Sequence, residues 1–282
     1  MQAVILDDGV IQAGEIHPEL IELYPVRAML LDDAEIDEVM AFYAAHAHYG
    51  LRYPHDPQWV KAHIGVDFFL FGIKARDELI AVAWIAKKRD FVYFVLKNDC
   101  LILENNGAFA DSGGWCVRPD YQGKGLFQLL TATVISSFWF TWIHRGRAPL
   151  LWGRMMGSKD DDGNPLFWNR VGEAVTGLSY RALLELPFGS MEGAIFAHWP
   201  REPIPVAEIP REIVAQTLGK SLGRLVEPKN RFVQWGLTEV SDRLVPTSLN
   251  YFVCATENSI RDPAQFFREA FSRVVRKLED SA

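Results

Sequence analysis

The 282-residue sequence has little cysteine and no concentration of basic residues. Its three cysteines, Cys100, Cys116 and Cys254, form neither a CxxC pair nor an even set of disulfide partners, which indicates a reducing intracellular compartment. The net charge is −7, and lysine and arginine form no cluster anywhere in the chain. Because a protein that binds nucleic acid normally presents a basic face, no nucleic-acid partner is expected.

The sequence also lacks a hydrophobic run long enough to suggest a membrane span. The most apolar segment, residues 127–143, is interrupted by serine, threonine and glutamine and is short for a bilayer crossing. The first residues, MQAVILDDGV, do not combine a basic region with an apolar stretch, so no signal peptide is expected. We therefore predict a cytoplasmic protein with no membrane partner, in which residues 127–143 form a buried helix.

What the sequence does contain is an alternation of β-rich runs and helical segments. Hydrophobic residues make up 49% and charged residues 23%, which is ordinary globular composition, and the length suffices for one large core or two modest ones. Asp32 and Glu35 have the spacing of a capping box and predict the start of the first helix. Strands are expected at 1–16 (two, around Asp8-Gly9), 25–31, 68–86 (two), 91–107 (one or two), 113–119, 149–156, 179–186, 231–237 and 248–255, and helices at 31–47, 58–64, 125–144, 165–172, 212–225 and 262–280.

This order of elements predicts an α/β fold (mixed α+β), with a mixed sheet and helices on both faces. Residues 1–25 are expected to form an N-terminal strand hairpin or arm, and residues 26–200 the core. From about residue 201 the pattern becomes proline-spaced, so residues 201–282 are expected to form a C-terminal extension. This extension either packs on the core or forms a small second domain.

The segment from Gln122 to Gly125 places two glycines at the junction of a strand and the long helix. Several main-chain N–H groups could point outward there, and with the positive end of the helix dipole they would bind phosphate oxygens, with Lys124 as a cation at the rim. A tight turn without a ligand explains Gly-x-Gly equally well. Neither G-x-x-x-x-G-K-[ST] nor G-x-G-x-x-G opening a first βαβ unit is present, which disfavours a nucleotide hydrolase or a dehydrogenase.

The residues around this loop resemble the acyl-CoA-binding motif of the GNAT-superfamily N-acyltransferases. The resemblance rests on VRPDYQGKGL, from Val117 to Leu126, followed by Leu129 and Leu130. The family pattern ends with glycine or alanine, and this sequence departs from it there with Phe127.

A second stretch, residues 154–175 with a continuation at 188–219, is similar to the arginine N-succinyltransferases. It combines an acidic glycine loop, a helix with Phe167-Trp168 and a proline-rich segment that enters a helix. The resemblance implies a GNAT-like core over residues 26–200, whose mixed, mostly antiparallel central sheet is splayed at the cofactor site. It also implies acyl-CoA, as acetyl-CoA or succinyl-CoA, for the co-substrate, and no metal.

In the resemblance, the cofactor is held by main chain rather than by side chains. The strand at 113–117 would pair with the pantetheine arm, and the glycine loop would hold the pyrophosphate. The cofactor-binding residues implied are Trp115, Cys116, Val117, Gln122, Gly123, Lys124, Gly125, Leu126 and Phe127.

The resemblance also implies catalytic positions. Many GNAT enzymes place a carboxylate eleven residues before the first Gln or Arg of the motif, which here is Asp111, so Asp111 is predicted to be the general base. The alternative is that Asp111-Ser112-Gly113 is only a strand-entry turn. Family members often use a tyrosine to protonate the leaving thiolate, and the equivalent position holds Trp168, which is either a packing residue or a wall of the acyl site.

The amine acceptor is expected to contact the loop after the first helix. Tyr49, Arg52 and Tyr53 stand in this ring-rich loop, and an ordinary surface loop is the alternative. Arg154 either pairs with a substrate carboxylate or braces residues 160–162. The predicted substrate-binding residues are Tyr49, Arg52, Tyr53, Arg154 and Trp168.

Metal binding is not expected from the two polar motifs that might suggest it. His46 and His48 lack a third ligand at a suitable spacing, and the DDDGN run at 160–164 has its glycine at the wrong spacing for a calcium loop.

Together these patterns predict an acyl-CoA-dependent N-acyltransferase that transfers an acetyl or succinyl group to the amine of a small molecule, such as an amino acid like arginine. The alternative is a catalytically inactive GNAT-like module that binds CoA or a protein partner. The nine tryptophans and the apolar C-terminal helix are compatible with a homodimer.

Overall fold

The computed structural model is described over residues 26–47, 51–75, 78–107, 109–138, 151–155, 157–220, 232–234 and 237–255, with residues 265, 269–270, 272–274 and 276–277. The chain forms two compact units. Unit 1 contains Met1–Ala86, Ser112–Leu150 and Thr256–Ala282, and unit 2 contains Lys87–Asp111 and Leu151–Ala255. The core at 26–200 and the extension at 201–282 stay predictions.

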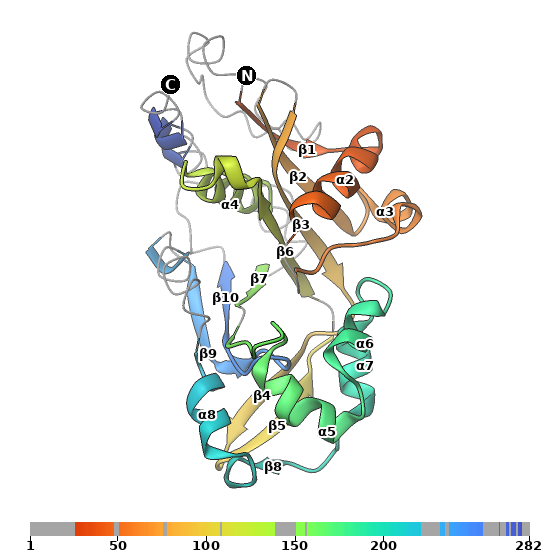
Figure 1. Ribbon diagram of the computed structural model, residues 1–282, viewed down its shortest axis with the longest axis vertical. Helices are drawn as coiled ribbons and strands as arrows, with labels where there is room; N and C mark the ends of the chain where they lie inside the picture. The colour runs from red at the N-terminus through yellow and green to blue at the C-terminus, as the bar shows by residue number, and fades with distance from the viewer. Residues whose placement is uncertain are drawn as a thin grey trace. The chain divides into compact units, whose positions relative to one another are not determined.

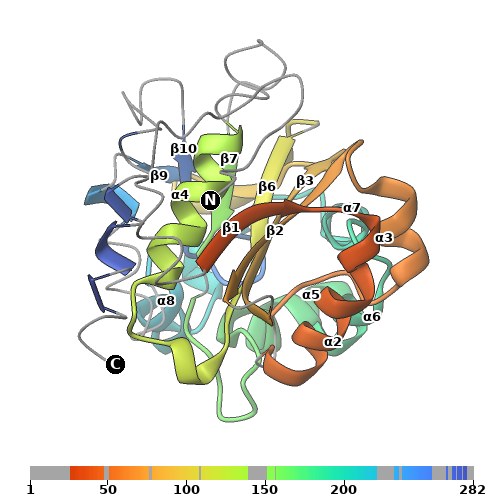
Figure 2. The same ribbon diagram turned by 90° about the horizontal axis from the view of Figure 1, so that it is seen from above.

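Unit 1 is built on neighbouring strands in the order β1-β2-β3-β6. Strands β1, β2 and β3 pair antiparallel, with Leu31 opposite Leu70 and Phe68 opposite Ala86. Figure 2 shows α4 on one face of this sheet and α2 and α3 on the other, so the middle of β3 is buried on both faces. The elements are β1 (Val26–Leu31), β2 (Phe68–Ala75), β3 (Glu78–Lys88), β6 (Phe109–Val117), α2 (Ile36–His46), α3 (Pro57–His63) and α4 (Leu126–Phe138).

The helix starts in unit 1 follow from local capping. The N–H of Asp32 donates to Glu35 Oε2 (3.0 Å), which completes the predicted capping box ahead of a 3-10 turn, Asp33–Glu35, and α2. Asp56 accepts from Gln58 N–H (2.9 Å) and so caps α3, which forms most of the helix expected at 58–64.

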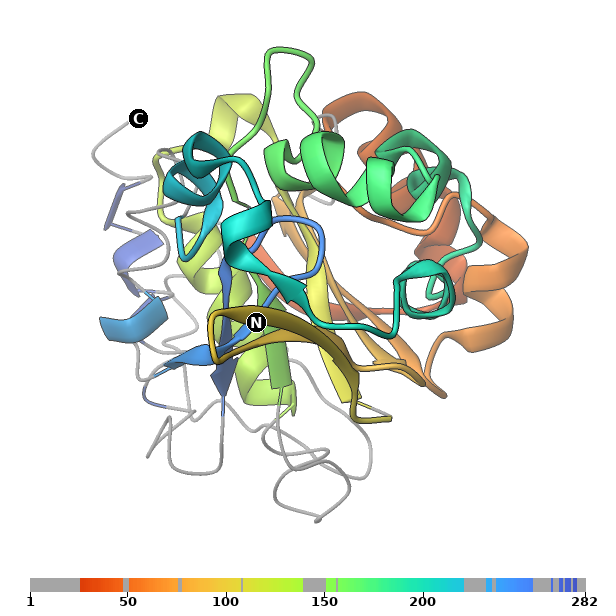
Figure 3. The ribbon, with the colours of Figure 1, turned by 90° about the horizontal axis from the view of Figure 1, so that it is seen from below.

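Unit 2 contains a second, antiparallel run of strands in the order β7-β10-β9-β4-β5-β8. Figure 3 shows its helices, coloured green to cyan, on one side of the yellow β4–β5 hairpin. The strands are β4 (Val92–Lys97), β5 (Cys100–Asn105), β7 (Leu151–Arg154), β8 (Ile204–Pro205), β9 (Thr238–Leu244) and β10 (Tyr251–Ala255). The helices, labelled in Figure 1, include α5 (Glu173–Thr176), α6 (Tyr180–Glu185), α7 (Met191–His198) and α8 (Arg211–Thr217), with a π-helical turn at Trp168–Gly172 before α5.

Two predicted elements need correction. Residues 179–186 were expected to form a strand, but they form α6, because Ser179 caps the helix by accepting from Ala182 N–H (3.1 Å) and Tyr180 and Leu183 are buried at helical spacing. Residues 232–234 of the strand expected at 231–237 are helical. Strand β9 and helix α7 were not predicted. The hairpin expected within residues 1–16 lies outside the described residues.

Candidate functional site

The glycine loop lies between a short 3-10 helix, Pro119–Tyr121, and α4. Gln122 N–H closes the 3-10 turn by donating to the Pro119 carbonyl (3.2 Å). Gly123 and Gly125 follow with φ of +79° and +86°, in the left-handed region that glycine adopts without steric cost. α4 then begins at Leu126. The backbone therefore favours glycine at both positions, and the family pattern itself specifies Gly125.

Four consecutive main-chain N–H groups are unused in this loop. The amides of Gly123, Lys124, Gly125 and Leu126 donate no hydrogen bond to any residue that the structure describes. Gly123 is exposed, and a Cβ built on it would meet no atom within 4 Å. A run of unpaired donors at the positive end of a helix of this length binds anions such as phosphate.

The side chains of Phe127 and Lys124 flank these amides. The ring of Phe127, where the motif departs from the family pattern, packs on Trp115 with 5.6 Å between ring centroids and lies beyond 4 Å of a Cβ built on either glycine. The Lys124 ammonium lies over the Tyr121 ring, 4.7 Å from its centroid, so a cation stands at the rim of the loop.

The strand that leads into the loop, β6, carries a glycine pair packed beneath aromatic rings. Gly114 has φ +64°, and a Cβ there would lie 2.3 Å from Trp84 Cδ1. The Tyr43 hydroxyl donates to the Gly114 carbonyl (2.8 Å), and burial, followed by the nearby Cys116 and Tyr53, raises the pKa of Tyr43 well above its ordinary value. These rings hold the main chain of β6 in a fixed conformation.

Among the predicted strand residues, the side chains divide by burial. Cys116 is buried, and burial raises the pKa of its thiol to about 11, while Trp115 and Val117 are half-buried. The sulfur of Cys116 is therefore part of the core, and only its main chain could serve a cofactor.

The predicted acceptor loop packs against the same rings. Tyr53 stacks on Tyr43 (centroids 4.4 Å apart), and the carbonyl of Arg52 accepts from the Trp84 indole (3.0 Å). Burial, together with the charge of Arg52, lowers the pKa of His55, which lies against Tyr53. Arg52 and Tyr53 are thus brought beside β6 in unit 1, and Tyr49 lies outside the described residues.

In unit 2, Asp111 belongs to a buried charge cluster with Lys88, Arg154 and Glu192. Lys88 Nζ lies 2.8 Å from Asp111 Oδ2 and 3.0 Å from Glu192 Oε1. The Arg154 guanidinium pairs with the same two carboxylates through two different nitrogens. Two positive and two negative charges therefore alternate around a closed ring, which offsets the cost of their burial.

Two members of the charge cluster keep a capacity to bind a ligand. Asp111 Oδ1 is buried and makes no hydrogen bond with the described residues, although Oδ2 receives both cations. The Arg154 side chain is 20% exposed, against 5% or less for the other three. Burial acts to lower the pKa of Arg154, but Asp111 and Glu192 outweigh it and raise that pKa, so Arg154 stays charged.

The sequence offered residues 160–162 as alternative partners of Arg154, and Arg154 does not pair with them. Asp160 instead organises the acidic turn itself: it accepts from the main-chain N–H of Asn164 (2.8 Å) and Asp162 (3.1 Å). This is the solvated turn that the sequence predicted.

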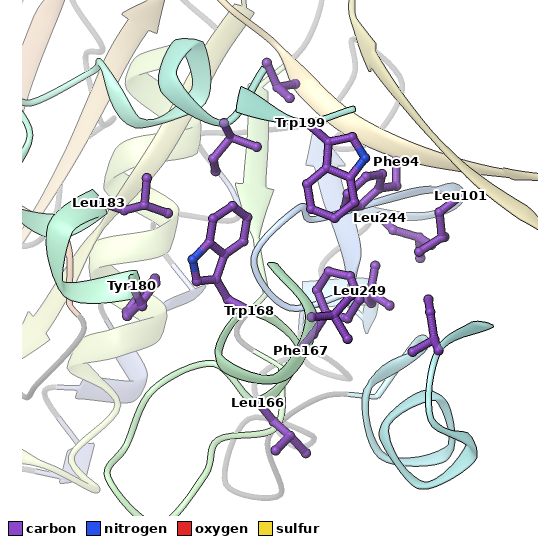
Figure 4. Packing of buried hydrophobic residues seen from close by; sticks show 14 of the residues in the cluster. Phe94, Leu101, Leu166, Phe167, Trp168, Tyr180, Leu183, Trp199, Leu244 and Leu249 are labelled. Carbon is purple, nitrogen blue, oxygen red and sulfur yellow. The ribbon is translucent and has the colours of Figure 1, made fainter. Parts of the chain in front are cut away.

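Trp168 lies in the hydrophobic core of unit 2, where Figure 4 shows it among Phe167, Tyr180, Leu183 and Trp199. It is fully buried, and its indole N–H donates to the Leu178 carbonyl (2.8 Å). Of the two interpretations of Trp168, this geometry favours the packing residue over the wall of an acyl site, because no polar atom of the ring is left for a substrate.

Lys88 and Glu192 were missed by the sequence analysis. Lys88 follows the apolar run of β3 and looks like an ordinary solvated strand end, and Glu192 stands in the first turn of a helix that was not predicted. A buried ion pair has no local sequence signal, so only the folded chain brings these residues to Asp111.

No group of three metal-binding side chains occurs among the described residues. None of the helices in the described part of the chain is long and apolar enough to cross a membrane.

Comparison with solved structures finds acyltransferases. The chain matches arginine/ornithine succinyltransferase subunit AI from Pseudomonas aeruginosa with a TM-score of 0.59 and 16% sequence identity, over 85% of this chain and 79% of that one. Two other matches are partial. A GCN5-related N-acetyltransferase from Kribbella flavida has a TM-score of 0.30 and 19% identity, over 46% of this chain and 29% of that one. An N-acetyltransferase from Staphylococcus aureus Mu50 has a TM-score of 0.30 and 10% identity, over 45% and 69%.

The chain therefore has a mixed α/β fold like that of the P. aeruginosa subunit, and the predicted fold class is confirmed. No protein-family model and no curated protein sequence matches the chain.

Proposed function

We propose that this protein is an acyl-CoA-dependent N-acyltransferase that transfers an acetyl or succinyl group to the amine of a small molecule. The observation that carries the proposal is the run of four unused amides from Gly123 to Leu126, in a motif of the GNAT type and on a GNAT-like fold. These donors would bind the pyrophosphate of the cofactor.

The main chain of β6 would hold the pantetheine arm. Trp115 to Val117 precede the loop, and the rings of Tyr43 and Trp84 fix the strand by contacts to Gly114. A strand whose conformation is set by packing presents its main-chain groups at little entropic cost on binding.

The acceptor would be recognised by Asp111 and Arg154. The amine nitrogen attacks the thioester carbonyl carbon, the carbon–sulfur bond breaks, and CoA leaves as its thiolate while the nitrogen gives up a proton. Asp111 Oδ1 would accept that proton, directly or through water. Arg154 would bind a carboxylate of the acceptor or of the acyl group, and such a pair of partners suits an amino acid.

One observation favours the alternative of a binding module without catalysis. Asp111 has no exposed surface and its Oδ2 is held by both Lys88 and Arg154. A structural role for the charge cluster would leave the protein able to bind CoA and unable to turn it over.

Two measurements separate these functions. Isothermal titration with CoA, acetyl-CoA and succinyl-CoA tests the loop, and binding of none of them would overturn both proposals. A thiol-release assay across amino acids and polyamines then tests turnover. We expect Asp111→Asn to lower turnover strongly while the matched exposed variant Asp161→Asn leaves it unchanged. If the protein binds CoA but releases no thiol from acyl-CoA with any of the amines, the result supports the binding module.

A further inference from the structure

The described part of the C-terminal helix contacts the glycine loop within unit 1. Lys277 Nζ donates to the Gly123 carbonyl (3.0 Å), and one turn earlier Arg273 Nη1 donates to Gln128 Oε1 (2.6 Å) on α4. Val274 lies between these two residues on the helix and is fully buried. Figures 1 and 2 both show this helix, in dark blue, beside α4. Residues about 150 positions apart in sequence thus meet at the loop.

The contact from Lys277 fixes the orientation of one peptide plane. In a trans peptide, the C=O of Gly123 and the N–H of Lys124 point in opposite directions. Holding the carbonyl toward Lys277 therefore turns the Lys124 N–H toward the other side of the loop, and this N–H is one of the four unused donors. A carbonyl turned toward the phosphate side would repel an anion.

The C-terminal helix also covers one side of the loop. A Cβ built on Gly125 would lie 3.4 Å from Val274 Cγ2 and 3.9 Å from Lys277 Cδ, so the helix closes that side by packing. A Cβ on Gly123 would meet nothing within 4 Å. The loop is therefore backed by the C-terminal helix at Gly125 and left open at Gly123.

We propose that Lys277 is a positioning residue for the cofactor: by binding the Gly123 carbonyl and packing on Gly125, it holds the loop in the conformation that presents its amides to a pyrophosphate. This inference rests on the proposed function. It makes the affinity for CoA depend on the C-terminal helix, which the loop motif does not include.

The test compares three full-length variants by isothermal titration with CoA and succinyl-CoA. Lys277→Met removes the donor and keeps the length of the side chain, and Lys277→Arg retains a donor. Arg276→Met is the matched control, because Arg276 is exposed on the same helix and donates to the Ser272 carbonyl of its own turn. We expect binding to be about fivefold weaker for Lys277→Met, the worth of a typical hydrogen bond. Lys277→Arg should restore most of it and Arg276→Met should not change it. Circular dichroism and melting temperature confirm that each variant is folded.

A salt series separates positioning from direct contact with phosphate. If Lys277 acts through the loop, the affinities of wild type and Lys277→Met fall in parallel as salt rises. If Lys277 pairs with a phosphate, the wild type loses more affinity and the two curves converge, because an exposed ion pair is screened. Convergence, or equal affinity of wild type and Lys277→Met, overturns this inference and leaves the proposed function intact. A wild type that binds neither ligand overturns both.

Discussion

The glycine loop of unit 1 and the charge cluster of unit 2 differ in how their polar groups are paired. The loop presents main-chain donors that no described residue occupies, and its open glycine is exposed. In the charge cluster four charged side chains pair with one another, and Asp111 Oδ1 stays buried without a hydrogen bond to the described residues. The first arrangement uses no side-chain partner, whereas the second depends on each of its four charged side chains. Changes in the loop should therefore affect ligand affinity, and changes in the cluster should affect folding.

The largest effect is expected from breaking the charge cluster. Glu192→Ala leaves Lys88 and Arg154 with one carboxylate between them, so an uncompensated buried charge remains. We expect the free energy of unfolding to fall by about 3 to 5 kcal/mol, measured by urea denaturation.

An exposed ion pair supplies the matched control for this variant. Glu185 pairs with Arg181 one turn away on α6, and both side chains are mostly exposed. Glu185→Ala should change stability by less than about 0.5 kcal/mol. If Glu192→Ala and Glu185→Ala lower the free energy of unfolding equally, the charge cluster is exposed to solvent and not buried.

The second prediction compares two glycines that share a positive φ. A Cβ at Gly114 would lie 2.3 Å from Trp84 Cδ1 and 2.5 Å from the Tyr43 hydroxyl, whereas a Cβ at Gly123 would meet nothing. Gly114→Ala should cost about 3 kcal/mol by combining overpacking with strain, and Gly123→Ala about 1 to 2 kcal/mol by strain alone. Thermal unfolding of both variants measures the difference, and similar losses would show that packing under Trp84 is not tight.

The third prediction concerns Cys116, whose buried thiol is neutral, unlike the charged side chains of the cluster. Its folded pKa is about 11, raised by burial from the 9.0 of an ordinary thiol. As pH rises through this range the unfolded chain releases the proton first, so this contribution to stability is complete below pH 9 and is lost toward pH 11. The loss is about 2 to 3 kcal/mol. Urea titrations of wild type and Cys116→Ala at several pH values check it: the wild type should lose more stability. Parallel curves would contradict burial of the thiol.

Much of the fold could be predicted because its signals are local. The capping box at Asp32 depends on neighbouring residues and lies where it was expected, and the two strands expected at 68–86 are β2 and β3. The run at 179–186 failed because its apolar residues fit either period, and only the Ser179 cap decides for a helix. Strand β9 is hard to predict for the opposite reason, since TEVSDRL is too polar to suggest a strand without its partner β10.

The candidate site divides in the same way. The loop could be predicted because a positive φ restricts two positions to glycine, which leaves a mark in the sequence. Asp111 was reached only through the family spacing. The cluster residues Lys88 and Glu192 could not be found, because an ion pair between residues 104 positions apart leaves no periodic pattern. The same holds for Lys277, whose role depends on where the last helix packs.

The smallest effect is expected at Phe127, where the motif departs from its family. If a large side chain there narrowed the phosphate space, Phe127→Ala would strengthen CoA binding severalfold. Its ring instead packs on Trp115 and lies beyond 4 Å of a Cβ built on either loop glycine, so we expect a change of less than about threefold, below the worth of one hydrogen bond. Titration with CoA measures this, with Lys277→Met as the reference for a change that does reach the loop. A tenfold gain in CoA affinity would show that the Phe127 ring hinders access of the phosphates to the loop amides. The loop would then be less open than the empty space around Gly123 indicates.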